Sequence, residues 1–365
     1  MPQQEPFWNP YRLIGPQPEP DRAAPATHEK FQGICGHITG KIRALTPIFV
    51  GGREQGYFFK SNGKYCIPAT SFKGMLRSLI EMVGNGCAIV GRGQAPCQST
   101  DHLCVACRLF GMSLSGSKNV LFQGKVYVGD LPVIGTVAAP QAVEVSPGAP
   151  KPEHRAFYRS PSCRKYYYHQ RQPWSNVVNR TAQQNMIRKI RPLPAGTEFK
   201  LDIRFDNLTK PELGLLLYCL ELERNLAVVI SDHQGTDITL RGDLHHKIGG
   251  CKPLGYGSIA IDIQPQRQDF YSPEQRYRTL GGQAAGLSEA DWQQVRQEQA
   301  KYHWHGLKDH DLLQQLRAML LFPGADTPDP RDYKYPDHLW FKSHSQVPLK
   351  AICRRVTKGE TDGGQ

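Results

Sequence analysis

Two hydrophobic periods alternate along the chain, and each predicts one kind of element. A period of two is typical of strands with one buried face. It occurs in four segments, 31–45, 119–130, 197–206 and 259–263. A period of three to four is typical of amphipathic helices. It occurs in two segments between these strands, 71–83 and 209–221, and the second opens with a capping box at Thr209 and Glu212. The predicted order is therefore strand–helix–strand, twice.

This order is that of the ferredoxin-like fold, although the pattern alone fits many proteins. We therefore predict an α+β chain with a ferredoxin-like, RRM-type core in residues 30–265. The segments outside the core pattern are an irregular N-terminal arm in 1–29, a cysteine-rich insertion in 84–111, an aperiodic stretch in 131–196, and a helical and irregular C-terminal extension in 266–365.

The helix at 71–83 begins with features of an anion-binding site. Ser71 is a natural N-cap, and Pro68 separates the helix from the preceding loop. Lys73 and Arg77 lie four residues apart, so both are expected beside the helix N-terminus, whose N–H groups and dipole attract anions. The alternative is a solvated helix face that carries two cations.

Charge strengthens the case for an anionic partner. The 365 residues carry a formal net charge of +12, which is typical of proteins that bind polyanions but also of merely basic soluble proteins. The aperiodic stretch mixes cations with aromatic residues, a composition that suits phosphates and stacked bases. The candidates we single out there are Arg164, Lys165, Tyr167 and His169. Disorder is the alternative for this stretch.

A glycine-rich loop occupies residues 247–258. Glycines there allow positive φ and close approach of a ligand to backbone N–H groups, and Lys247 and Lys252 add charge. The glycines are Gly249, Gly250, Gly255 and Gly257. The loop does not match the phosphate-binding loop of nucleotide triphosphatases, and a tight turn into the last core strand is the alternative.

The cysteine-rich insertion predicts a structural zinc site. Five candidate ligands lie close together in sequence: Cys87, Cys97, His102, Cys104 and Cys107. The C-x-x-C spacing of the last two lets both sulfurs reach one tetrahedral ion, and a site with four protein ligands is closed to substrate. The sequence does not choose four of the five. A redox pair or unrelated core cysteines are the alternatives.

The chain shows no sign of a membrane protein or of export. No apolar run approaches the ~18 residues needed to span a bilayer, and residues 1–21 lack the apolar segment of a signal peptide. We therefore expect a cytoplasmic protein without membrane partners.

Four motifs occur in one order along the chain. They are I-P-x-x-S-x-K-G-x-x-R at 67–77, C-x-x-C-R-L-F-G at 104–111, F-x-N-L-x-x-x-E-L at 205–213, and K-I-G-G-x-K-P-L-G-Y-G-S at 247–258. Together they resemble the RAMP superfamily, and the match is nearest to backbone-type subunits of type III, III-D-like, CRISPR effector complexes. The resemblance covers about residues 30–265.

The resemblance implies that the chain holds a guide RNA (crRNA) and presents complementary target RNA, together with other subunits of an antiviral ribonucleoprotein. It implies that Ser71, Lys73 and Arg77 hold guide phosphates. It also implies that Gly249, Gly250, Lys252, Gly255 and Gly257 form the family's glycine loop, and that a thumb-like hairpin comes from 131–196.

The family's cleaving members use an aspartate and a divalent metal in the loop after the first strand. The corresponding loop here, 50–60, has Glu54 as its only carboxylate. We therefore expect a non-cleaving scaffold. One alternative is a target-RNA endoribonuclease that uses Mg²⁺ at Glu54. Another, based on the cysteines alone, is an unrelated zinc or redox protein.

Overall fold

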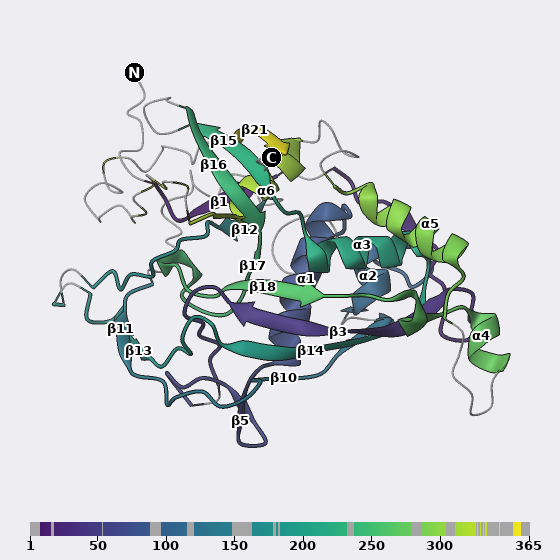
Figure 1. The fold of residues 1–365 in the computed structure, drawn as a ribbon, viewed down its shortest axis with the longest axis horizontal. Coiled ribbons are helices and arrows are strands. Elements are labelled where there is room, and N and C mark those ends of the chain that lie inside the picture. The colour runs from purple at the N-terminus through teal and green to yellow at the C-terminus, as the bar shows by residue number, and fades with distance from the viewer. Residues whose placement is uncertain are drawn as a thin grey trace, which may run out of the picture.

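An antiparallel sheet of six strands forms the centre of the computed structural model (Figure 1). Its longest strands, β3 (Ile34–Ala44) and β14 (Glu198–Leu208), pair along most of their length. Strand β18 (Ser258–Ile263) pairs with the other side of β3, and β9 (Val126–Val128) pairs with β14. The order is β17–β18–β3–β14–β9, where β17 is His246–Lys247, and β19 (Phe270–Tyr271) also pairs with β3.

The structure describes most of the chain. The described residues are 8–15, 18–52, 54–87, 96–114, 120–147, 163–177, 180–181, 183–231, 237–278, 286–303, 311–325, 327, 329, 331, 333, 343 and 353–358.

The predicted alternation sets which face of the sheet is buried. Ile38 and Ile42 of β3 are opposite Ile203 and Phe199 of β14, and all four are buried. The intervening residue Lys41 is exposed. Helices α1 (Ala69–Val83) and α3 (Lys210–Glu221) contact each other and contribute their leucines to the same core. Both helices lie on one side of the sheet (Figure 1).

The two core helices begin differently. The predicted capping box of α3 is present, because Thr209 accepts from the N–H of Glu212 and Glu212 accepts from that of Thr209. The prediction that Ser71 caps α1 is wrong. Helix α1 begins at Ala69, and its first N–H donates to Asp130 Oδ1 at 2.9 Å. Asp130 is distant in sequence, so the local pattern could not show it.

The predicted strand at 119–130 is two strands. Strand β8 (Val120–Gln123) pairs with β7 (Gly111–Leu114), and β9 joins the central sheet. The break lies at Gly124, whose missing Cβ would lie 2.3 Å from the carbonyl carbon of Phe110. Lys125 follows and turns into the core.

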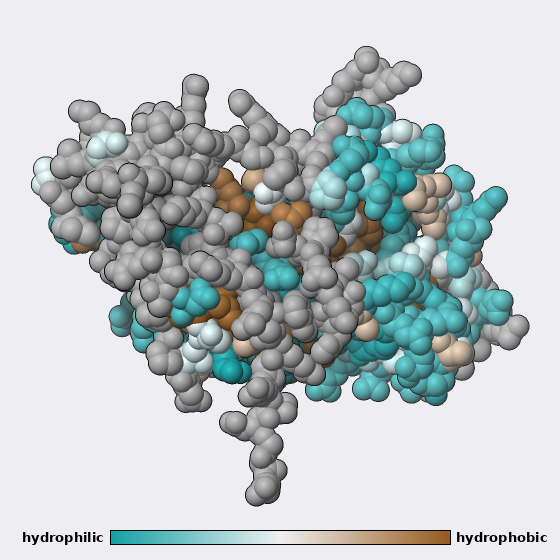
Figure 2. Space-filling view, turned by 90° about the horizontal axis from the view of Figure 1, so that it is seen from above, coloured by the Kyte–Doolittle hydropathy of each residue, from teal (hydrophilic) through white to brown (hydrophobic). Residues whose placement is uncertain are grey.

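Described parts of the C-terminal extension pack onto the core. Helices α5 (Glu289–Ala300) and α6 (Asp311–Leu320) lie in this extension, which was expected to be partly helical, and α5 packs on α3. From above, the right-hand side of the molecule, where α5 lies, is hydrophilic (Figure 2). A second sheet has the order β20–β16–β15–β21 and was not predicted. Its strands are β15 (Leu226–Ser231), β16 (Asp237–Leu244), β20 (Leu321–Pro323) and β21 (Cys353–Lys358).

Short strands also occur where irregular chain was expected. In the arm, β1 (Tyr11–Ile14) pairs with β12 (Arg164–Tyr167) of the aperiodic stretch. The other short elements are β2 (Arg22–Ala23), β4 (Lys60–Ser61), β5 (Lys64–Ile67), β6 (Leu103–Cys104), α2 (Val105–Phe110), β10 (Leu131–Pro132), β11 (Val143–Val145), β13 (Arg188–Ile190), η2 (Lys252–Leu254), η3 (Arg267–Asp269) and α4 (Pro273–Arg278). None of the helices in the described ranges has the length and apolar content needed to cross a membrane.

Candidate functional site

A cavity of about 500 Å³ lies between α1, β12 and the glycine-rich loop. It brings together three segments that the sequence analysis singled out separately. Of the predicted RNA-binding residues, those that line the cavity are Ser71, Lys165, Tyr167, Gly249, Gly250 and Lys252, and Lys247 joins them. Folding therefore brings residues from positions 71, 165–167 and 247–252 to the wall of one cavity.

Helix α1 presents mostly small side chains to the cavity. Thr70, Ser71, Gly74 and Ser78 line it, together with the larger Met75 and Leu79. A Cβ added at Gly74 would have no atom within 4 Å, so this position opens onto free space. The helix therefore leaves room for a ligand instead of filling the cavity itself.

Three of the four glycine amides predicted to hold phosphate, those of Gly250, Gly255 and Gly257, already have backbone partners. Gly250 N–H donates to the Phe49 carbonyl at 2.8 Å, and Gly257 N–H donates to the Pro47 carbonyl at 2.9 Å. Gly249 has φ +86°, and a Cβ there would lie 2.3 Å from the Phe49 oxygen. The glycines thus permit a tight turn against the segment after β3. Asp130 likewise occupies the first N–H of α1. Charge for an anion must therefore come from side chains.

Three lysines supply that charge, and burial of their side chains lowers the pKa of each. Burial lowers the pKa of Lys165 to about 8. Burial, and then the charge of Lys252, lowers the pKa of Lys247 to about 7. Burial also lowers the pKa of Lys252. An anion in the cavity would favour the charged form of all three.

Lys247 and Lys165 each contact neutral groups. Lys247 Nζ donates to the Tyr168 carbonyl at 3.0 Å and contacts Ser258 Oγ at 3.4 Å. Lys165 Nζ lies 3.6 Å from the ring centroid of Tyr11. Within the described part of the chain, the ion pairs include none with Lys247 or Lys252. The cavity therefore has an excess of positive charge.

Other predicted RNA-binding residues lie outside the cavity lining. Lys73 points toward the Phe110 ring, with Nζ 6.0 Å from its centroid. Arg77 pairs with Glu81 at 2.8 Å, and its side chain is only 16% exposed. Arg164 Nη1 pairs with the same carboxylate at 2.5 Å. These cations face the cysteine-rich insertion and the side of α1.

Two further predicted residues are enclosed. His169 is fully buried between Ser258 Oγ at 2.9 Å and the His245 carbonyl at 3.0 Å. Burial places its pKa well below the ordinary value, so the ring is neutral. Gly255, with φ +89°, packs against Pro173.

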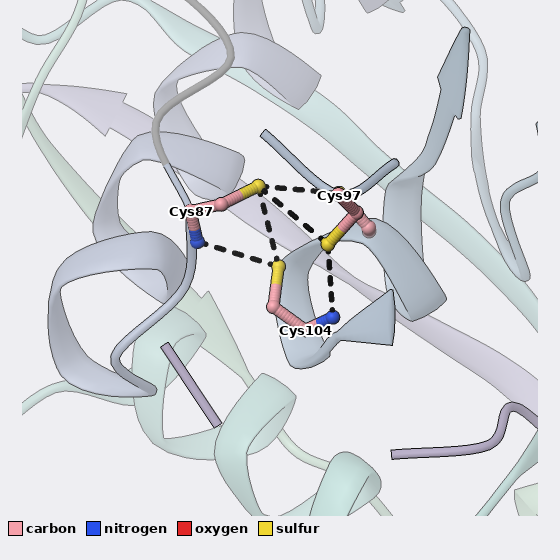
Figure 3. Close-up of side chains that lie close together, drawn as sticks. Cys87, Cys97 and Cys104 are labelled. Atoms are coloured by element: carbon pink, nitrogen blue, oxygen red, sulfur yellow. Dashed lines mark hydrogen bonds between the residues drawn. The ribbon is translucent and has the colours of Figure 1, made fainter. Parts of the chain in front are cut away.

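Four cysteines form a second candidate site. The sulfurs of Cys87, Cys97, Cys104 and Cys107 all lie within 4.8 Å of one another, and all four residues are buried. Figure 3 shows three of these side chains pointing toward one another. Cys87 Sγ lies 3.5 Å from the sulfurs of Cys104 and Cys107 and 3.9 Å from that of Cys97.

These distances fit a zinc ion. Tetrahedral coordination with Zn–S bonds of 2.3 Å separates the sulfurs by about 3.8 Å. A hydrogen bond from Cys107 contributes most to lowering the pKa of Cys104, to about 6, whereas a hydrogen bond with Cys104 raises that of Cys107. Four crowded thiols cannot all ionise without a cation, and metal binding supplies one. The cluster could therefore hold a metal such as zinc.

The structure also selects among the five candidate ligands. His102 is exposed, and its Nδ1 contacts the Asp101 carbonyl at 2.7 Å. It lies outside the group of four sulfurs, so its inclusion among the ligands is not supported.

Glu54 lies in an exposed turn. Its carbonyl accepts from the N–H of Tyr57 at 3.2 Å, between the bridged residues Gly51 and Phe58. In the described ranges, the cysteine cluster is the one group of side chains arranged to hold a metal ion. A magnesium site at Glu54 is therefore unsupported.

Sequence reasoning missed residues that complete both sites. Lys247 was noted only as added charge, yet burial in the cavity wall lowers its pKa to about 7. Arg22 was not considered, although it forms a hydrogen bond with Cys97. No signal in the local sequence marks Arg22, because its strand β2 reaches the cluster only by pairing with β6.

Fold and sites together define an α+β protein with a lysine-lined cavity and a cluster of four cysteines that could hold a metal ion. The model of the RAMP superfamily matches residues 41–260, and the chain belongs to that superfamily. The family resemblance is thus confirmed at this level. No curated protein sequence matches the chain. Among solved structures, a chain described as "Type IV-B CRISPR Complex" is 16% identical, covers 70% of this chain and 96% of its own length, and has a TM-score of 0.35.

Proposed function

We propose that this protein is a guide-RNA-binding backbone subunit of a CRISPR effector complex of type III. The observation that carries the proposal is the convergence of Lys165, Lys247 and Lys252 on one cavity, where the described residues include no ion pair with Lys247 or Lys252. Membership of the RAMP superfamily and the net charge of +12 support it.

The fold is compatible with a ferredoxin-like, RRM-type core. The strand order β18–β3–β14–β9, antiparallel throughout, with α1 and α3 as the two crossover helices, is the order expected of that core. We propose that the described parts of 131–196 belong to the thumb-like segment that separates bases of the guide.

In this proposal the cavity holds phosphate groups. Ammonium groups bind phosphate as point charges, and the desolvated cavity strengthens each contact. Tyr167 supplies a ring at the cavity wall on which a base can stack. Phosphate contacts position a nucleic-acid strand without reading its sequence. A subunit that accepts guide RNAs of any sequence needs contacts of this kind.

We further propose that the subunit does not cleave RNA by itself and acts with target RNA and other subunits in the cytoplasm. Glu54 is one exposed carboxylate, and cleavage assisted by metal ions needs a fixed coordination geometry. The cysteine cluster has a structural role in this proposal, since four protein ligands close a zinc site.

The test measures RNA affinity of the full-length protein against salt. Removing two phosphate contacts by K247A with K252A should lower affinity and reduce the log–log salt slope by about 1.4, since each contact contributes about 0.7 on single strands. The control K64A with K200A removes the same charge from two exposed positions.

The control should leave the slope nearly unchanged. An equal loss in both double variants would show that only net charge matters and would overturn the cavity as the phosphate site. A wild-type protein that binds no RNA at low salt would overturn the proposed function as a whole.

A further inference from the structure

Arg77 contacts the cysteine cluster directly. Its Nη2 donates to Cys107 Sγ at 3.3 Å, and its Nη1 donates to the Gly111 carbonyl at 2.7 Å. Its Nε donates to Glu81 Oε1 at 2.8 Å. All three nitrogen atoms of the guanidinium therefore donate hydrogen bonds, which fixes its orientation. The single ammonium group of a lysine cannot reproduce this arrangement.

The cluster has a second guanidinium on its other side. Hydrogen bonds from Arg22 to Glu19 and then to Cys97 raise the pKa of that arginine. Two backbone N–H groups also donate to sulfur, from Cys87 to Cys104 at 3.3 Å and from Cys104 to Cys97 at 3.2 Å.

This donor set compensates part of the charge of a loaded site. One Zn²⁺ with four thiolates has a net charge of about −2, and burying that charge is unfavourable unless it is paired. Arg77 and Arg164 share the carboxylate of Glu81, so one positive charge remains beside Cys107. Arg22 is paired with Glu19 and contributes a hydrogen bond to Cys97. Groups that hydrogen-bond to metal ligands orient them and tune metal affinity.

Arg77 also connects the cluster to the cavity wall. Glu81 is 5% exposed and accepts from Arg77 through one oxygen and from Arg164 through the other. Arg164 begins β12, and the next residues, Lys165 to Tyr167, line the cavity. The Tyr166 hydroxyl donates to the Ser78 carbonyl of α1 at 3.1 Å, which fixes the same strand on the same helix.

We propose that Arg77 is a positioning residue of the metal centre, not a phosphate ligand: it compensates the thiolate of Cys107 and, through Glu81 and Arg164, fastens β12 beside the anion cavity. The link to the cavity rests on the proposed function. The role at the metal does not, because it follows from contacts with sulfur alone.

The test compares R77K with wild type in the full-length protein. Zinc affinity is measured by competition with a chromophoric chelator, and Co²⁺ replaces zinc to report the thiolate environment by its absorption spectrum. We expect R77K to lower zinc affinity roughly 10–100-fold, the usual effect of losing a partner of a metal ligand, and to alter the Co²⁺ spectrum. K73A, one turn earlier on α1, is the matched control and should change neither.

RNA affinity of the zinc-loaded proteins separates the two roles of Arg77. If Arg77 were a phosphate ligand, the R77K protein would keep most of the wild-type RNA affinity and would have the wild-type zinc affinity. That result would overturn the proposal. Loss of zinc affinity in R77K, with K73A unchanged, supports it. This zinc readout stands even if the wild-type protein binds no RNA, so failure of the proposed function is recognised separately.

A second variant keeps the test valid if R77K does not fold. R22Q removes the other guanidinium from a partly exposed side chain that lies outside α1. Loss of the hydrogen bond to Cys97 predicts lower zinc affinity for R22Q as well. Wild-type zinc affinity in R22Q would overturn the argument that guanidinium donors at the sulfurs strengthen metal binding.

Discussion

At the scale of single residues, the main feature of the protein is a set of lysines whose pKa is lowered by burial. Lys247 is held by a carbonyl and a hydroxyl group, and its pKa is about 7. Lys165 lies against the Tyr11 ring, with a pKa of about 8. Both groups therefore change charge near neutral pH, at the position where the proposed ligand would bind.

RNA affinity should consequently depend on pH. Only the protonated amines attract phosphate, so binding takes up protons when the free protein is partly deprotonated, and affinity falls as pH rises from about 6.5 to 8.5. His246, which also lines the cavity, has a pKa of about 4 and stays neutral throughout this range. Lys252 carries a further charge beside Lys247 and moves its pKa in the same direction as burial.

The measurement is RNA binding by fluorescence anisotropy at constant ionic strength. K247A should bind more weakly and show a flatter pH profile than wild type. The exposed-lysine variant K64A should retain the wild-type profile. A K247A profile as steep as that of wild type would contradict the assignment of the pH dependence to Lys247.

At the scale of elements, one buried ion network joins α3 to the sheet. Glu212 caps α3 and also pairs with Lys125 Nζ at 2.7 Å and with Arg108 Nε at 2.7 Å. The Lys125 side chain is completely buried. These ion pairs, together with the hydrogen bond to Thr209, lower the pKa of Glu212 although burial acts in the opposite direction.

Removing this carboxylate should be far more harmful than removing the local cap. E212A leaves Lys125 as an uncompensated buried charge, and breaking such a pair usually reduces stability by about 3–5 kcal/mol. T209A removes one capping hydrogen bond and should reduce stability by about 1 kcal/mol. Urea unfolding of the zinc-loaded proteins compares the two. Similar losses in both variants would argue against a special role for the Lys125 pair.

At the scale of the whole molecule, the C-terminal extension is part of the same packed structure as the core. Gly214 of α3 faces α5 so closely that a Cβ would lie 2.7 Å from the Gln299 nitrogen. Lys210 Nζ also pairs with Asp291 Oδ1 of α5 at 2.6 Å. The glycine therefore serves the close approach of two helices that are about 80 residues apart in sequence.

Because of this contact, replacing Gly214 by alanine should lower the stability of the protein instead of raising it. Alanine in a helix interior normally stabilises by about 0.5–1 kcal/mol relative to glycine. G74A should show that gain, because a Cβ at Gly74 meets nothing within 4 Å. G214A should destabilise instead, since backbone atoms of α5 must move. Thermal unfolding of both variants tests this, and a G214A protein as stable as G74A would show that α5 is not docked on α3 in solution.

Several features could be predicted from the sequence because they depend on neighbours along the chain. The core strands β3, β14 and β18, the helices α1 and α3, the Thr209 capping box and the C-x-x-C pair each follow from local spacing. Four of the five candidate metal ligands do converge. The second sheet was not predicted because its strands come from 226–244, 321–323 and 353–358, so their pairing depends on segments far apart in sequence.

The sequence by itself determined the main helices and strands of the core, and it supplied the cations and sulfurs of both sites. Only the tertiary structure decided how they are used. It turned Arg77 toward Cys107 and gave the first N–H of α1 to Asp130. It also brought Lys165 beside Lys247. The physical reason is that secondary structure follows from side chains three or four positions apart, whereas charge compensation and burial depend on residues that meet only when the chain is folded.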